Sequence, residues 1–162
     1  MPMLTRVLDY LKANGVPHLH TVHEAVYTAR DLAAVEHLPL REVAKVVVFR
    51  SEYGFSMAVV SADRLVDLEE LRSALMFSHV RLATEEELFK IFPTCELGAM
   101  PPLGNLVGMD VYMDQALARE SFIAFNAGTH RDVIEMHFDD YLKLVDPIIL
   151  PLSVPMVSSK TR

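Results

Sequence analysis

The stretch "AKVVVFRSEYGFSMAVVSA", residues 44–62, decides the fold. Its first part, "AKVVVFR" over 44–50, is rich in β-branched residues and predicts a buried strand. The letters "EYG" at 52–54 predict a turn, and "FSMAVVSA" over 55–62 predicts a second strand that runs back beside the first. We therefore expect a β-hairpin here.

Helices and further strands surround this hairpin. Helical spacing of apolar residues predicts a first helix ending at Asn14-Gly15, and further helices at 28–38, 67–75, 84–92 and 139–145. Strands are expected at 16–23, 106–114, 121–128 and 132–138. Because strands and helices interleave while hairpins are frequent, we expect a mixed α/β sheet rather than a purely parallel one. We expect one domain over 1–150 and a loosely held C-terminal tail over 151–162.

Composition narrows the class of protein. Hydrophobic residues make up 51 % and charged residues 23 %, which is typical of a globular chain. The net charge of −7 argues against a protein that coats nucleic acid with its whole surface. This charge does not exclude a small basic patch at the mouth of a binding site. The candidate residues for this patch are Lys45, Arg50, Arg30 and Arg131. A single cysteine, Cys95, and no apolar run long enough for a bilayer favour a cytoplasmic protein.

Two patterns suggest catalysis but have a simpler interpretation. His18, His20 and His23 form H-x-H-x-x-H, which is either a metal site or the polar edge of a strand. No cluster of cysteines or carboxylates completes a ligand set, so we expect no metal. Cys95 is either a nucleophile or a small half-buried thiol, and we favour the thiol. The serines, including Ser51, Ser61 and Ser121, lack a nucleophile-elbow motif.

Lys45 and two loops give clearer indications of a binding site than these two patterns do. Lys45 shares a strand face with Val47 and Phe49, so it either meets an anion in a cleft or extends its ammonium to water. The loop Gly98–Gly104 is either a well-packed turn or a stiff wall whose backbone N–H groups face a ligand. The third stretch, "FNAGTHRD" over 125–132, is either a hairpin turn or a set of polar groups at the mouth of a site.

The order of "AKVVVF", "GAMPPLG" and "FNAGTHRDVIEMHFDDYLKLV" resembles the YbaK/EbsC family of trans-editing aminoacyl-tRNA deacylases. The same domain is inserted in bacterial prolyl-tRNA synthetases. The resemblance covers the chain from about Leu4 to Pro147. It implies a mixed α/β (α+β) fold with a largely antiparallel, barrel-like central sheet surrounded by helices. It also implies hydrolysis of a wrongly attached amino acid from the 3′ end of tRNA without a metal or another cofactor.

The resemblance also implies roles for individual residues. Lys45 matches the family's signature lysine near the terminal adenosine and its phosphate. Gly98 and Pro102 match the ends of the family's G-x-x-x-P loop, which borders the aminoacyl pocket. The remaining candidates for catalysis are Thr129 and His130, and those for substrate binding are Ala99, Met100, Pro101, Gly104 and Gly128.

The residues of "FNAGTHRD" and the length of the chain favour the alanyl-tRNA(Pro) editors over the cysteinyl-tRNA(Pro) editors. The expected partners are the acceptor end of mischarged tRNA and a prolyl-tRNA synthetase, with neither a membrane nor specific DNA among them. Two rival functions stay open at this point. One is a non-catalytic module that binds a nucleotide or a tRNA end, and the other is a metal-dependent hydrolase that uses His18, His20 and His23.

Overall fold

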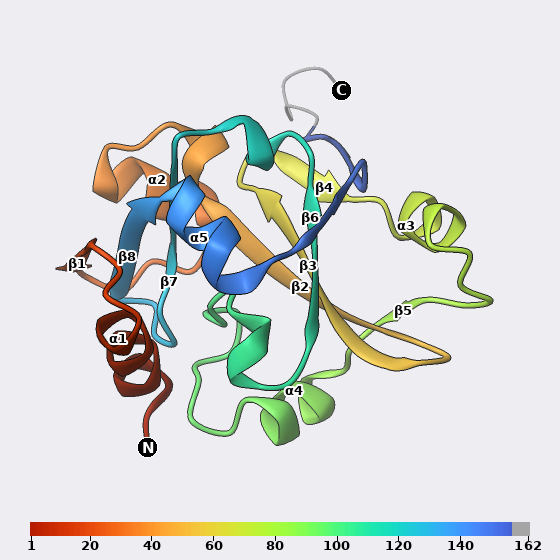
Figure 1. The fold of residues 1–162 in the computed structure, drawn as a ribbon, viewed down its shortest axis with the longest axis horizontal. Helices are drawn as coiled ribbons and strands as arrows, with labels where there is room; N and C mark the ends of the chain where they lie inside the picture. Colours follow the sequence, from red (N-terminus) through yellow and green to blue (C-terminus); the bar gives the residue numbers. More distant parts are fainter. Residues whose placement is uncertain (157–162) are drawn as a thin grey trace.

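The expected hairpin forms the middle of the largest sheet (Figure 1). In the computed structural model, which describes residues 1–156, β2 (Ala44–Ser51) pairs antiparallel with β3 (Gly54–Ser61) along their full lengths. The short strand β5 (Arg81–Leu82) extends the sheet antiparallel to β2. On the other side, β6 (Asp110–Asp114) pairs parallel with β3, and β9 (Ile148–Leu150) pairs parallel with β6. The sheet is therefore mixed, as the sequence predicted.

Two smaller sheets complete the β structure. The order β1 (His18–Val22), β8 (Asp132–His137), β7 (Phe122–Asn126) makes an antiparallel three-stranded sheet. The last strand, β10 (Ser153–Pro155), pairs antiparallel with β4 (Arg64–Val66). Antiparallel pairs thus predominate, but the sheets do not close into a barrel. Within residues 1–156, one isolated bridge, Val43↔Ala124, links the three-stranded sheet to the five-stranded one.

Helices and short 3-10 turns connect these strands. The helices are α1 (Met3–Ala13), α2 (Ala29–Glu36), α3 (Leu68–Ala74), α4 (Glu85–Ile91) and α5 (Phe138–Val145), with short 3-10 turns at Leu40–Glu42, Gly104–Leu106 and Leu117–Arg119. The expected capping box of α4 is present, since Thr84 and Glu87 bond each other reciprocally. The side chain of Thr28 caps α2 by accepting a hydrogen bond from the backbone of Asp31. No helix in residues 1–156 is long and apolar enough to cross a bilayer.

The main hydrophobic core lies where the two larger sheets, α1 and α5 meet. It takes Met57 and Val59 from β3, Phe125 from β7 and Ile134 from β8, all fully buried. Tyr141 of α5 is also fully buried there. These side chains fill the space between the sheets, so the core holds the two sheets together in addition to the bridge between Val43 and Ala124.

Two expectations about individual segments are wrong. The tail is not loosely held where the structure describes it, because Leu152 is fully buried and β10 pairs with β4. The part of the tail at 157–162 lies outside the described residues. Of the expected strand at 106–114, only Asp110–Asp114 is extended. The preceding residues enter a 3-10 turn, where the backbone N–H of Met109 bonds the carbonyl of Gly104.

Candidate active site

Lys45 and Gly98 lie far apart in the sequence but border the same cleft, which has a volume of about 450 Å³. The cleft opens at the start of β2, beside the N-terminus of α2. Sequence reasoning had named Arg30 as a cation at a basic mouth, and Arg30 also borders this cleft. The other lining residues are Tyr27, Thr28, Ala29, Ala62 and Met156.

The environment of Lys45 explains why its charge is available to an anion. Lys45 faces Val60 across the hairpin and is only partly buried. Burial lowers the pKa of its ammonium, the charge of Asp63 opposes that shift, and the positive charge of Arg30 adds to it. Ser61 donates a hydrogen bond of 2.6 Å to Asp63, which ties this carboxylate to the end of β3. Two cations that repel each other in one cleft favour an anionic ligand.

The glycine loop and the "FNAGTHRD" turn are joined by backbone hydrogen bonds. The N–H of Gly128 donates to the carbonyl of Ala99 at 2.9 Å, and the N–H of Glu96 donates to the carbonyl of Gly128 at 2.8 Å. The side chain of Glu96 also accepts a bond of 2.8 Å from the backbone N–H of His130. These three bonds hold the wall that contains Gly98 against the turn that contains His130.

Gly98 lies beside the ring of His130. Gly98 has φ +85°, a left-handed conformation that glycine adopts readily, and a Cβ at this position would lie 3.5 Å from Cε1 of His130. Nε2 of the buried His130 ring lies 2.7 Å from the carbonyl of Leu97, so this nitrogen carries the hydrogen and donates it. Nδ1 is buried without a hydrogen-bond partner in residues 1–156. The ring of Tyr27 packs against the imidazole with centroids 4.8 Å apart.

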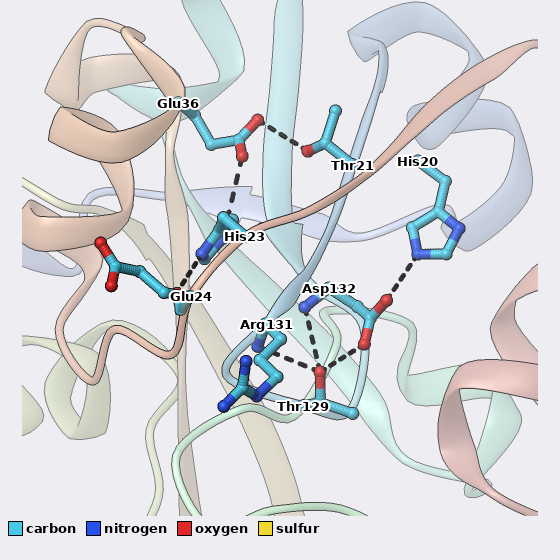
Figure 2. A network of polar contacts seen from close by, with 8 residues as sticks. All are labelled: His20, Thr21, His23, Glu24, Glu36, Thr129, Arg131 and Asp132. Atoms are coloured by element: carbon cyan, nitrogen blue, oxygen red, sulfur yellow. Dashed lines mark hydrogen bonds and ion pairs between the residues drawn. The ribbon is translucent and has the colours of Figure 1, made fainter.

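The side chain of Thr129 forms its hydrogen bonds within the turn, as Figure 2 shows. Its hydroxyl donates a bond of 2.6 Å to Asp132 and accepts bonds from the backbone N–H groups of Arg131 and Asp132. The other oxygen of Asp132 lies 2.7 Å from Nε2 of His20 on β1 (Figure 2). Thr129 therefore fixes the turn that carries His130, and it is not among the residues that border the cleft.

The second half of the glycine loop is packed inside the molecule. Ala99, Met100, Pro101, Pro102 and Gly104 are all buried, and none of them borders the cleft. The carbonyl of Pro102 accepts a bond of 2.6 Å from the hydroxyl of Tyr141. A Cβ at Gly104 would lie 2.4 Å from the carbonyl oxygen of Met109, so this glycine permits a close approach of two backbone segments. Gly128 likewise packs closely against Met3 of α1.

The remaining candidates lie elsewhere. Arg50 borders no part of the cleft and lies near Glu87 and the ring of Phe55. Arg131 is exposed and also lies outside the lining of the cleft. Burial raises the pKa of the Cys95 thiol to about 12, with the nearby charge of Glu96 adding to the shift. A thiol with this pKa is protonated at neutral pH, so it lacks the thiolate that a cysteine nucleophile needs.

The three histidines of H-x-H-x-x-H have separate partners. His20 bonds Asp132, His18 bonds the carbonyl of Val16, and His23 bonds the carbonyl of Glu24. Nε2 of His23 lies 3.8 Å from a carboxylate oxygen of Glu36, and Figure 2 shows the two side chains facing each other. No group of three or more histidine, cysteine or carboxylate side chains in residues 1–156 is arranged to hold a metal ion.

Sequence reasoning missed several residues of the site. Tyr27 and Ala29 flank Thr28, the residue that caps α2. The predicted cap, followed closely by the cation Arg30, was the sequence signal that could have identified them. Met156 lies in the segment that was expected to be loose, and no sequence signal placed it in the cleft. Glu96 gave no signal either, since its role depends on contacts with a turn more than 30 residues away.

Comparison with known proteins identifies the family. Residues 23–144 match the model of the aminoacyl-tRNA editing domain, so the chain belongs to this family. Among curated proteins, it is 28 % identical over 108 residues to the proline–tRNA ligase of Fervidobacterium nodosum, covering 67 % of this chain. It is 30 % identical over 119 residues to that of Exiguobacterium sibiricum, covering 72 % of this chain. The chain spans only 18 % and 20 % of the lengths of these ligases.

Solved structures show the same fold. A crystal structure described as a candidate trans-editing enzyme for prolyl-tRNA synthetase matches with a TM-score of 0.83 and 22 % identity, over 95 % of this chain and 98 % of that one. A crystal structure of a hypothetical protein matches with a TM-score of 0.82 and 16 % identity, over 92 % and 99 % of the two chains. At these identities the likeness establishes the mixed α/β fold of an editing domain.

Proposed function

We propose that this protein hydrolyses the ester of mischarged tRNA in trans, with Ala-tRNA(Pro) as its substrate. One observation supports the proposal above all: in a chain of the editing family, Lys45 and Gly98 border one cleft. Prolyl-tRNA synthetase is the partner that we propose, because its product is the tRNA to be checked and the curated relatives are proline–tRNA ligases.

Hydrolysis of this ester requires little chemical participation by side chains. An ester between an amino acid and ribose is already activated, so positioning and stabilisation of the oxyanion are the main requirements. Water attacks the carbonyl carbon, the bond from that carbon to the ribose oxygen breaks, and the proton lost by the water goes to that ribose oxygen, which leaves free tRNA and a free amino acid. A neighbouring ribose hydroxyl that attacks first takes over the acyl group as a second ester, which water then cleaves in the same way.

The charges of the cleft match the RNA end of this substrate. We assign to Lys45, assisted by Arg30, the phosphate and ribose of the terminal nucleotide. We assign to the backbone at Gly98, backed by the ring of His130, the wall beside the ester. The two bonds of Glu96 and the bond between Gly128 and Ala99 keep this wall in place.

The choice of alanine rests on size selection. We propose that the aminoacyl part of the cleft, beside Gly98, is stiff and sized for one methyl group. A pyrrolidine ring could then enter only by moving that wall, so proline is spared. Rejecting a smaller side chain is harder, because a missing methylene changes binding by only about 1–3 kcal/mol. Glycine is therefore expected to be cleaved as well. Cysteine is the closest competitor in size, and the subgroup of cysteinyl-tRNA(Pro) editors is the alternative within this family.

The experiment is a deacylation panel. Purified protein is offered Ala-tRNA(Pro), Cys-tRNA(Pro) and Pro-tRNA(Pro) at equal concentration in the presence of a chelator, and the rates of ester loss are compared. Fastest loss of the alanyl ester with the prolyl ester intact is the expected result. Fastest loss of the cysteinyl ester would move the protein to the other subgroup. Tight binding of tRNA without cleavage of any ester would instead mean a non-catalytic binding module.

A further inference from the structure

Met156 borders the cleft together with Lys45, although it belongs to the last residues that the structure describes. It lies 12 residues beyond the end of the match to the editing family, which covers 23–144. The cleft of this protein therefore includes a wall that the family match does not contain. The question is which part of a ligand this wall contacts.

The C-terminal segment 152–156 is held firmly enough to form a wall. Leu152 is fully buried, its N–H donates to Asp114 at 3.1 Å, and its carbonyl accepts from Asp67 at 2.8 Å. The next residues form β10, which pairs with β4, and Arg64 of β4 donates a bond of 2.6 Å to the hydroxyl of Ser153. Figure 1 shows the end of the described chain beside β4.

The backbone of Met156 places it on the lysine side of the cleft. Its N–H donates a bond of 3.0 Å to the carbonyl of Asp63. The carboxylate of Asp63 is the negative charge that acts on Lys45. Met156 is therefore anchored to the residue that accompanies the signature lysine, whereas the wall of Gly98 is anchored to the turn of His130.

Tyr27 adds an aromatic surface to the same cleft. The side chain borders the cleft and 73 % of its surface is exposed, so the ring is accessible to a ligand. An exposed tyrosine ring and a flexible thioether both pack well against the flat face of a heteroaromatic base. Arg30 and Lys45 supply positive charge for a phosphate. These four side chains together suit a nucleotide better than an amino acid.

We propose that Met156 and Tyr27 contact the base of the terminal nucleotide, so that the C-terminal segment 152–156 is a functional part of the substrate cleft. The proposal rests on the proposed function for the choice of an RNA end as ligand. It adds the two residues that bind the base. Size offers support, because a cleft of about 450 Å³ has far more room than an alanyl group needs.

The test measures binding without hydrolysis. The probes are two uncharged RNA minihelices with the acceptor stem of tRNA(Pro): one ends in an intact CCA, and the other carries an abasic ribose at the last position. The wild-type protein is expected to bind the intact probe about tenfold more tightly than the abasic one, a typical effect of stacking one base. Met156→Ala and Tyr27→Leu should each remove most of that difference while leaving the affinity for the abasic probe unchanged.

Three controls keep the result specific. Val154→Ala changes an exposed side chain of β10, just before Met156, that does not border the cleft, so it should bind both probes as the wild type does. Tyr27→Phe retains the ring and should retain the preference for the base. Circular dichroism and Tm confirm that each variant is folded.

Two outcomes would overturn the proposal. In the first, folded Met156→Ala and Tyr27→Leu keep the wild-type preference for the intact probe. In the second, they weaken both probes equally, which would mean that these residues shape the cleft without touching the base. Because no ester is involved, failure of the proposed hydrolysis would appear separately in the deacylation panel.

Discussion

The side chain of Glu96 accepts a hydrogen bond of 2.8 Å from the backbone N–H of His130. The backbone of Glu96 also donates to the carbonyl of Gly128, so a single residue fastens both ends of a short segment of the turn. Glu96 lies two positions before Gly98, at the start of the loop that borders the cleft. It is therefore placed to control how closely the glycine wall and the histidine turn approach each other.

Replacing Glu96 by alanine should lower activity through the position of His130. The N–H of His130 would lose its acceptor, and we expect Tm to fall by about 2–4 °C, as for a loss of roughly 1 kcal/mol in a chain of this size. Hydrolysis should fall about tenfold through kcat, since a small displacement of a reacting wall slows chemistry more than binding. Glu96→Gln, whose amide oxygen still accepts, should recover most of the rate. Equal loss of rate in both variants would contradict a positioning role.

We expect Lys45 to be needed for substrate binding and, at the same time, to lower the stability of the folded protein. Burial lowers the pKa of Lys45 below the ordinary value for lysine, so between the folded and unfolded pKa values the unfolded state binds more protons. Stability contributed by this group therefore rises with pH across that interval, and at neutral pH the charged lysine is unfavourable in the folded state. Lys45→Met should raise Tm by about 1–3 °C after allowance for screening by solvent.

The same substitution should remove most deacylation. The loss should appear largely as a higher KM, because the ammonium is expected to hold the RNA end rather than to react. Lys45→Arg is the matched control that keeps the charge and should retain part of the capture. Normal hydrolysis by a folded Lys45→Met protein would contradict the assignment of Lys45 to the site.

Gly98→Ala and Gly104→Ala should separate function from folding. At Gly98 the added Cβ meets only ordinary contacts, the nearest at 3.5 Å, so strain from φ +85° should lower stability by about 1 kcal/mol. Activity should fall more, because the added methyl group and the strained backbone alter the wall that we assign to the ester. At Gly104 the added Cβ would lie 2.4 Å from a backbone oxygen, so thermal melts should show a far larger loss of stability. The opposite order of the two Tm shifts would contradict this interpretation.

Cys95 should be dispensable for hydrolysis. Its pKa of about 12 leaves very little thiolate at neutral pH, and Cys95→Ala should retain at least half of the wild-type kcat/KM. Alkylation of the native protein by iodoacetamide at pH 8 should be slower than that of the unfolded chain. Loss of activity in a folded Cys95→Ala protein, with rapid alkylation, would revive the cysteine nucleophile.

Binding of tRNA should depend weakly on salt. The net charge is −7, and the cations that border the cleft are Arg30 and Lys45. Each phosphate contact contributes about 0.7–0.9 to the slope of log K against log salt, so two contacts give an expected slope of magnitude about 1.4–1.8. Arg30→Gln should reduce it by roughly one contact. A slope that corresponds to six or more contacts would indicate a basic surface elsewhere on the molecule.

Local signals in the sequence determined most of the secondary structure. The β-branched run at 44–50, the turn at 52–54 and the return strand produced the β2–β3 hairpin, because such residues favour a pleated, half-buried surface in any context. The capping residues Thr28 and Thr84 began their helices as predicted, since a cap is made by contacts within four residues. Lys45 could be identified as a candidate site residue for the same reason, because a cation within an apolar strand can be recognised from the sequence without knowledge of the rest of the fold.

The tertiary structure alone decided which residues share the cleft. The glycine loop had two interpretations in the sequence, and both apply to different parts of it: Gly98 borders the cleft, whereas Met100 and Pro102 are packed inside. Glu96 and Met156 had no local signal, because their positions come from bonds to His130 and Asp63, which are distant in the chain. Propensity acts over a few neighbouring residues, but a cleft depends on how sheets, loops and the C-terminal segment pack around one core.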